Sequence, residues 1–202
     1  MSAQQQAREL GISLDPVESG YLNLCIRSGN LLITSGHTSD LKGVLGKDLS
    51  VEQGYEAAAD CARKILCSVH DTHGTLDDLR VIKVLGCVYS APDFTDQHLV
   101  INGTSDLLHK IYGKDGDGYH ARSALGFAAL PTGAAVEVEA IFEIKEDPRN
   151  RQPALIAFIL SLLDLVFGFD SIPSYDNKYI DPKYCDKYYK YSDEALGNIR
   201  KL

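Results

Sequence analysis

The sequence predicts an α+β domain in which two helices cover one face of a mixed β-sheet. Extended apolar runs occur near the start, in the middle and at the end of the first 145 residues, and two amphipathic helical segments separate them. The predicted order is β-β-α-β-α-β-β. The 202-residue chain is 45% hydrophobic, so it can bury a core and wholesale disorder is excluded.

The first elements are predicted from periodicity and turn residues. Residues 3–10 form a predicted short helix that ends at Gly11. Residues 21–27 and 31–35 are predicted strands, and the turn Ser28-Gly29-Asn30 between them favours a hairpin.

The middle of the chain carries the two predicted helices. Residues 36–49 contain three glycines and are predicted to be a loop. A helix is expected to follow Ser50, with Gln53 completing a capping box. Residues 79–89 are rich in Val, Ile and Leu and predict a strand, and residues 96–112 predict the second helix.

The last two predicted strands flank a turn at residues 130–133, and we expect them to form a hairpin. Arg122 opens the first strand, and Glu137 and Glu139 lie on one face of the second. A guanidinium facing a carboxylate-bearing strand suits a small anionic substrate. The alternative is that these charges only solvate the outer face of the sheet.

Composition excludes several classes of protein. The net charge of −8 and the lack of basic runs in the first 150 residues argue against a nucleic-acid partner. The N-terminus carries no secretory signal pattern, and the five cysteines are odd in number without metal-binding spacing. We therefore expect free thiols and a cytoplasmic location, with no metal and no cofactor.

The chain changes character after residue 148. Residues 153–169 are nearly all apolar, but Asp164 interrupts them and they are shorter than the roughly 20 residues of a membrane span. We divide the chain into a domain over residues 1–147 and an extension over 148–202, which comprises this apolar helix and a tail rich in Tyr, Lys and Asp. A docked helix is preferred, and membrane contact or a poorly ordered or non-native extension are the alternatives.

Four segments follow one another along the chain in a recognisable order. Together with their surroundings they span about residues 8–145, and they resemble the RidA/YjgF family in its endoribonuclease L-PSP/chorismate-mutase-like branch. The segments are RSGNLLITSG at 27–36, SAPDFTD at 90–96, VING at 100–103 and ARSALGFAALPTGAAVEVE at 121–139.

The resemblance implies a homotrimer with sites between subunits, which bind a small carboxylate-bearing metabolite. It implies hydrolytic deamination of 2-imino or 2-enamino acids to 2-keto acids and ammonia. Arg122 is expected to bind the substrate carboxylate through two parallel contacts, and Glu137 is expected to handle the water or the proton. The other expected substrate-binding residues are Leu22, Ser35, Gly36, His37, Asn102 and Ala124.

Three positions depart from the family pattern. Leu22 stands where the family has an aromatic hydroxyl, His37 replaces a glutamine, and Ala124 replaces the cysteine of better-known members. The first two leave open a non-catalytic, carboxylate-binding sensor, while the acidic charge makes an endoribonuclease the weakest alternative. His120, beside Arg122, is interpreted as an ordinary interface histidine, and the alternative is that it lines the pocket.

Overall fold

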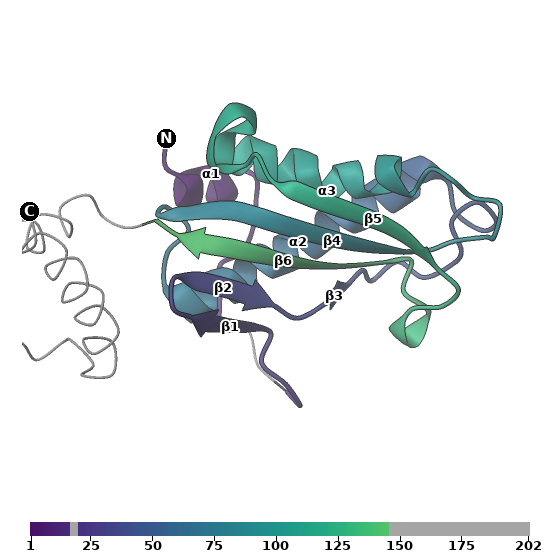
Figure 1. Cartoon of the computed structure of the whole chain (residues 1–202), viewed down its shortest axis with the longest axis horizontal. Coiled ribbons are helices and arrows are strands. Elements are labelled where there is room, and N and C mark those ends of the chain that lie inside the picture. Colours follow the sequence, from purple (N-terminus) through teal and green to yellow (C-terminus); the bar gives the residue numbers. More distant parts are fainter. Residues whose placement is uncertain (17–19, 146–202) are drawn as a thin grey trace, which may run out of the picture. The chain divides into compact units, whose positions relative to one another are not determined.

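The computed structural model describes residues 1–16 and 20–145, and within them a six-stranded mixed sheet packs against helices (Figure 1). The predicted α+β class is confirmed. The predicted extension 148–202, its apolar segment 153–169 and Cys185 lie outside the described residues. The elements are α1 (Ala3–Glu9), β1 (Cys25–Ser28), β2 (Leu31–Thr34), β3 (His37–Thr38), α2 (Val51–His73), β4 (Leu79–Tyr89), α3 (Gln97–Tyr112), the π-turn η1 (Gly113–Asp117), β5 (Ala121–Phe127), the 3-10 turn η2 (Pro131–Gly133) and β6 (Val136–Ile144).

The strand order is β1-β2-β6-β4-β5, and β3 pairs with β6 beside this path. The predicted hairpin of β5 and β6 is wrong, because β4 lies between them. β4 pairs in parallel with β5 and antiparallel with β6. Residues 128–135 carry the chain past the end of β4. Alternation in a sequence shows which residues share a face of a strand, but the strand's neighbour depends on tertiary pairing.

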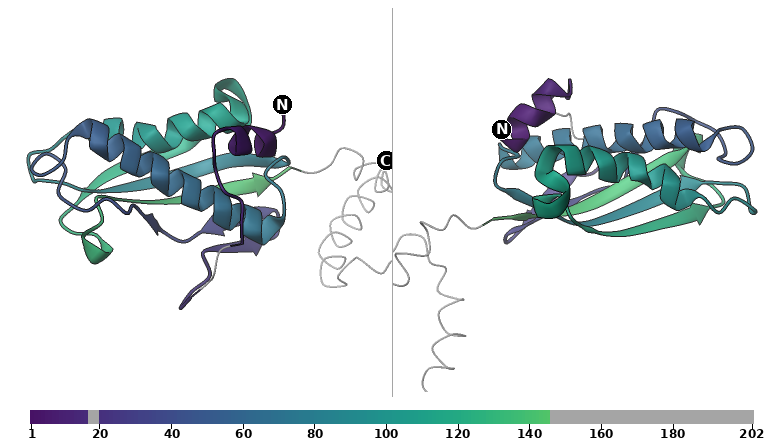
Figure 2. Two further views of the ribbon diagram at one scale, coloured as in Figure 1. Left: turned by 180° about the vertical axis from the view of Figure 1, so that it is seen from behind. Right: turned by 90° about the horizontal axis from the view of Figure 1, so that it is seen from above.

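Both long helices lie on one face of the sheet, which we call the covered face (Figure 2). α2 contacts β6 and α3, while α3 contacts β4 and β5. In β6 the residues facing the helices are buried and alternate with half-buried or exposed ones, as predicted. No element of residues 1–16 and 20–145 covers the opposite face, which we call the open face.

The N-terminus of α2 has the predicted capping box. The Ser50 hydroxyl accepts from the backbone N–H of Gln53 at 3.3 Å, and the Gln53 side chain accepts from the Ser50 N–H at 2.9 Å. The helix ends at Gly74, whose left-handed backbone terminates it. This local chemistry fixes where the longest helix starts and stops.

α2 and α3 approach each other closely at a position that only glycine fits. The Thr104 hydroxyl donates to the Ala58 carbonyl oxygen at 2.7 Å. A Cβ atom on Gly103 would overlap the Tyr55 carbonyl oxygen and lie 3.1 Å from the Ala59 nitrogen. The contact sets the position of α3 over β4 and β5, and thus of the side chains that α3 presents to β5.

Two further observations concern the cysteines and the length and polarity of the helices. The four cysteines of the described residues, Cys25, Cys61, Cys67 and Cys87, are free. In the same part of the chain, the helices are too short or too polar to cross a bilayer.

We predict that Gly103→Ala destabilises the protein. Alanine normally favours a helix, but here its methyl group meets backbone that cannot rotate away, and overpacking of this kind costs about 1–3 kcal/mol. The measurement is the free energy of unfolding in denaturant. The control is Gly20→Ala, where a Cβ meets no atom within 4 Å, and it should stay near wild type. Equal stability of the two variants would contradict the proposed packing.

Candidate functional site

Arg122 lies on β5 and reaches across to α3 on the covered face. Its Nη1 donates to Asn102 Oδ1 at 2.9 Å and to Ser105 Oγ at 3.1 Å, and its Nη2 donates to the His98 carbonyl oxygen at 3.2 Å. The three acceptors belong to residues four and three positions apart, so they share one side of the helix. β5 supplies the cation, and one stripe of α3 supplies its acceptors.

These acceptors are all neutral. Among the described residues no carboxylate lies within ion-pair distance of the guanidinium. An ion pair between Arg122 and a glutamate is therefore absent from this part of the chain. Burial lowers the pKa of Arg122, while Asp106 acts in the opposite direction. The guanidinium stays charged, because arginine titrates far above neutral pH.

Within residues 1–16 and 20–145, the Nε–H and one Nη2 hydrogen of Arg122 have no acceptor. Its Nη1 hydrogens and one Nη2 hydrogen have the acceptors described above. The remaining N–H groups, on Nε and Nη2, lie on adjacent nitrogens. That pair has the geometry for two parallel hydrogen bonds to a carboxylate.

Ser105 and His120 complete this cluster, and sequence reasoning did not assign either to the site. Ser105 Oγ lies 3.1 Å from His120 Nε2 as well as 3.1 Å from Arg122. Ser105 could have been found from the sequence, because it lies three residues after Asn102 and so shares one side of the predicted helix. His120 could have been found from its position two residues before Arg122, because alternate residues of an extended chain point to the same side; His120 itself lies just before β5 begins at Ala121.

Glu137 lies on the open face, because it alternates with buried Val136 and Val138 in β6. Gly36 packs against it, and a Cβ on this glycine would overlap the Glu137 Oε1 atom. Burial raises the pKa of the Glu137 carboxyl, and the nearby charge of Glu139 raises it further. The Glu137 carboxyl group therefore holds its proton up to a higher pH than an ordinary glutamate does.

Arg122 and Glu137 do not meet within one protomer. Arg122 is in register with Val84 of β4 and shares its covered face, whereas Glu137 is in register with Cys87 and lies on the open face. The expectation that the guanidinium faces the carboxylate-bearing strand is therefore wrong for a single chain. The structure divides the predicted residues into a cluster around Arg122 and another around Glu137.

Besides Gly36, three of the expected substrate-binding residues are near one of these two clusters. Asn102 is a direct acceptor of Arg122. Ala124 follows two residues later on the same side of β5, in register with Gly86. Ser35 precedes Gly36, and its hydroxyl donates to the Asn23 carbonyl oxygen at 2.7 Å, close to Leu22, which is 52% exposed.

His37 has a different environment from the one expected. Its Nδ1 lies 2.8 Å from the Ser35 carbonyl oxygen and its Nε2 lies 2.8 Å from Ser68 Oγ on α2. The ring is buried between β3 and α2, and this burial lowers its pKa. The imidazole therefore lies on the covered side, away from the Glu137 side chain.

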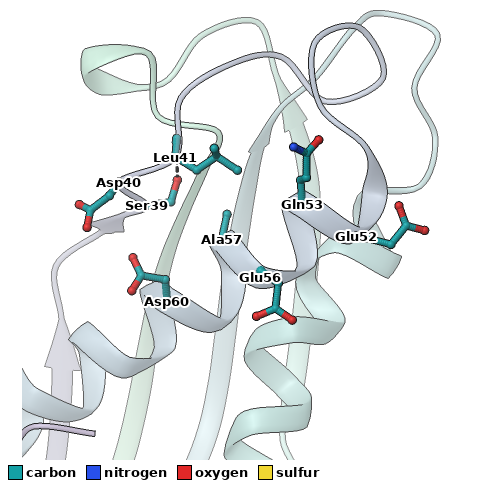
Figure 3. A pocket seen from close by; sticks show the side chains of 8 residues that line it. All are labelled: Ser39, Asp40, Leu41, Glu52, Gln53, Glu56, Ala57 and Asp60. Carbon is teal, nitrogen blue, oxygen red and sulfur yellow. Dashed lines mark hydrogen bonds between the residues drawn. The ribbon is translucent and has the colours of Figure 1, made fainter. Parts of the chain in front are cut away.

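A separate hollow of about 520 Å³ lies between α2 and the loop after β3 (Figure 3). Lys64 binds two of its carboxylates, Asp40 at 2.7 Å and Asp60 at 3.2 Å. None of the predicted site residues lines it, and no cluster of His, Cys, Asp and Glu within the described residues has metal-binding geometry. The lining residues are Ser39, Asp40, Leu41, Glu52, Gln53, Glu56, Ala57 and Asp60.

Comparison with known proteins gives consistent matches. Residues 14–144 match the family model described as Endoribonuclease L-PSP. The chain is 44% identical over 146 residues to protein TCP17 of Trypanosoma cruzi, covering 68% of this chain and 91% of that protein.

Solved structures include protein Atu1372 of unknown function from Agrobacterium tumefaciens. It is 38% identical with a TM-score of 0.64, covering 72% of this chain and 94% of that one. A candidate endoribonuclease from Shewanella oneidensis is 22% identical with a TM-score of 0.65, covering 71% of this chain and 100% of that one. At this lower identity the likeness supports the fold alone.

We predict that Glu137→Gln stabilises the protein at neutral pH. The folded-state pKa of Glu137 lies above its ordinary value of 4.5, so the ionised carboxylate costs stability above the folded pKa. Below pH 4.5 the carboxyl is protonated in both states and the cost disappears. Melting temperatures measured across this range should therefore converge in acid and separate, with the variant higher, at neutral pH.

The matched control is Glu143→Gln on the same face of β6. Glu143 is ion-paired with Arg80, so its replacement should leave stability unchanged or lower it. A Glu137→Gln variant that melts below wild type at neutral pH would contradict the assigned environment of Glu137.

Proposed function

The chain belongs to the endoribonuclease L-PSP family, the RidA/YjgF family that its sequence resembles, and on this premise we propose that it hydrolyses 2-imino and 2-enamino acids to 2-keto acids and ammonia. No cofactor takes part in the proposed reaction. The proposal rests on the chemistry of the two clusters, around Arg122 and around Glu137.

The observation that carries the proposal is the charge balance of Arg122. A half-buried guanidinium held only by neutral acceptors has an unmet preference for an anion, and its available edge matches a carboxylate. Imino acids, enamino acids and their keto-acid products all carry a carboxylate beside the reacting carbon. Arg122 binds that carboxylate and thereby fixes the position of the adjacent C=N bond.

Glu137 handles the protons of the hydrolysis. Its carboxylate takes a proton from the attacking water as the oxygen bonds to the C=N carbon, and the nitrogen is protonated in turn. The carbon–nitrogen bond then breaks, so that imino acid and water give keto acid and ammonia. The raised pKa of Glu137 suits this role, because a base with a pKa nearer neutral both accepts and returns a proton readily.

Assembly of several copies brings the two clusters together. Arg122 and Glu137 lie on opposite faces of one sheet, so a complete site requires Arg122 of one copy and Glu137 of another. The open face supplies a surface for such assembly, because it exposes several apolar side chains. We assign these contacts to a homotrimer, the assembly that the family resemblance implies. The exposed residues are Ile26, Ile33, Leu125 and Phe127.

The second candidate is a sensor that binds carboxylates without turnover. Leu22 favours it, since an exposed alkyl side chain stands where the family has an aromatic hydroxyl. A ribonuclease is the weakest candidate, because a net charge of −8 opposes binding of phosphates. The free thiols of the described cysteines suit a reducing compartment, so we place the protein in the cytoplasm.

We predict that Arg122→Ala lowers kcat/KM for imino-acid hydrolysis about 10- to 100-fold. The change removes charge-assisted hydrogen bonds worth about 1.5–3 kcal/mol. The assay generates imino acids from L-amino acids with an oxidase and follows the release of keto acid. Arg80→Ala is the matched control: Arg80 is an exposed arginine paired with Glu143, and its loss should not change the rate.

The same assay separates the candidates. Equal rates for Arg122→Ala and wild type would overturn the enzymatic role. Keto-acid binding that depends on Arg122, without any turnover, would support the sensor.

We further predict that mixed assemblies recover activity. Glu137→Gln should lower kcat about 10²–10⁴-fold, while Glu143→Gln, on the same face but paired with Arg80, should retain it. The Arg122→Ala and Glu137→Gln proteins are each impaired alone, but co-refolding them should create some sites with both native residues. The measurement is the specific activity of the mixture. No recovery, with mixed assemblies demonstrated by native mass, would show that the site does not combine two copies.

A further inference from the structure

Arg122 is the first member of a hydrogen-bonded chain that leads away from the candidate site. Arg122 Nη1 donates to Ser105 Oγ at 3.1 Å, and Ser105 Oγ lies 3.1 Å from His120 Nε2. The opposite ring nitrogen, His120 Nδ1, lies 2.6 Å from the Gly118 carbonyl oxygen. Four residues from β5, α3 and the loop between them thus form one continuous path.

The direction of each hydrogen bond in this path is determined by chemistry. A carbonyl oxygen can only accept, so His120 Nδ1 carries the proton toward Gly118. In a neutral imidazole Nε2 is then an acceptor, and it receives the hydroxyl hydrogen of Ser105. The Ser105 oxygen in turn accepts from Arg122. Every donor in the chain therefore meets an acceptor only when His120 is neutral.

Gly118, the last residue of this hydrogen-bonded chain, has a fixed backbone position. Gly118 is buried at the end of η1, where its N–H donates to the Gly113 carbonyl oxygen at 3.1 Å. A Cβ at this position would lie 2.6 Å from the same oxygen and 3.0 Å from the Leu108 carbonyl oxygen. The Gly118 carbonyl is therefore fixed relative to α3, and it fixes the orientation of the His120 ring.

We propose that His120 is a positioning residue that, through Ser105, holds Arg122 in the orientation that receives the substrate carboxylate, and that it does so in its neutral form. The inference rests on the proposed carboxylate-binding role of Arg122. His120 itself does not touch the substrate. It determines which way the Ser105 hydroxyl hydrogen points, and hence how the lone pairs of the Ser105 oxygen are aimed at Arg122.

Protonation of His120 reverses one link of the chain. Nε2 becomes a donor, so the Ser105 oxygen faces two donors and its own hydrogen loses its acceptor. The surrounding charges favour the neutral ring. Burial, the His109 ring with its centroid 5.4 Å away, and the Arg122 charge all lower the pKa of His120, while the Gly118 carbonyl raises it.

The other charged groups nearby are already engaged. On α3, Asp106 lies 3.9 Å from His109 and accepts from the Tyr55 hydroxyl at 3.0 Å. In η1, Asp117 is paired with Lys145 at 2.7 Å. The His109 ring lies against His120, so a His109 variant is the control for the pH profile.

The test measures binding of 2-oxobutanoate, a small keto acid, to the full-length protein by calorimetry, together with KM and kcat for imino-acid hydrolysis. His120→Ala and Ser105→Ala should each weaken binding and raise KM about tenfold, as expected for one lost hydrogen bond to a charged group, with kcat unchanged. The double variant should be no weaker than either single variant, because both changes break the same chain.

Two variants distinguish this role from general packing. His120→Gln places an amide oxygen near the position of Nε2, so it can accept from Ser105 and should bind close to wild type. As the pH falls from about 8 through the pKa of His120, which lies below 6.5, wild-type binding should weaken. His120→Gln should lack this step, while His109→Gln should retain it.

Three results would overturn the proposal. The first is that the losses of binding affinity in His120→Ala and Ser105→Ala add up in the double variant. The others are that His120→Gln binds as weakly as His120→Ala, or that the pH step in binding survives in His120→Gln. If His120→Ala does not fold, the pH dependence of binding by His120→Gln still tests the positioning role.

The Arg122→Ala variant distinguishes failure of the positioning role of His120 from failure of the proposed carboxylate-binding site. If it abolishes binding while the His120 and Ser105 variants match wild type, only the positioning role fails; if it binds normally, the proposed site itself fails.

Discussion

The contact between Arg122 and α3 is the interaction on which the candidate site depends. A guanidinium withdrawn from water normally requires a carboxylate partner, yet here its partners are a side-chain amide, a hydroxyl and a backbone carbonyl. These groups orient the cation without neutralising it. The helix can supply them because the close approach at Gly103 brings α3 against α2 and over the edge of the sheet.

The position of β4 in the centre of the sheet has an equally large effect. β5 and β6 pair with β4 in registers that place Arg122 beside Val84 and Glu137 beside Cys87, so the two side chains emerge on opposite faces. A single chain therefore holds two halves of the proposed chemistry, a cation that binds the anion and a carboxylate that moves the proton. The exposed apolar side chains of the open face give a physical reason for copies to associate and complete the site.

Local signals predicted the elements well. Ser50 and Gln53 marked the start of α2, because a capping box needs only residues three positions apart. The run of Val, Ile and Leu gave the bounds of β4, and the alternation in β6 separated its buried residues from its charged ones. The hairpin of β5 and β6 was a mistaken prediction, since the order of strands in a sheet depends on contacts between distant segments. The short strand β3 was missed for the same reason, because His37 pairs with Val138, which lies far away along the chain.

The sequence by itself determined the family and the helix boundaries, and it singled out Arg122 and Glu137 as candidate site residues, because each follows from a motif or from periodicity along the chain. It also indicated that Gly36 mattered, although not that the glycine makes room for the Glu137 carboxylate. Only the tertiary structure decided that Arg122 and Glu137 lie apart, that His37 is buried against Ser68, and that Ser105 connects His120 to Arg122. Hydrogen-bond partners and faces of a sheet are set by packing between elements, and that information is not carried by any one segment.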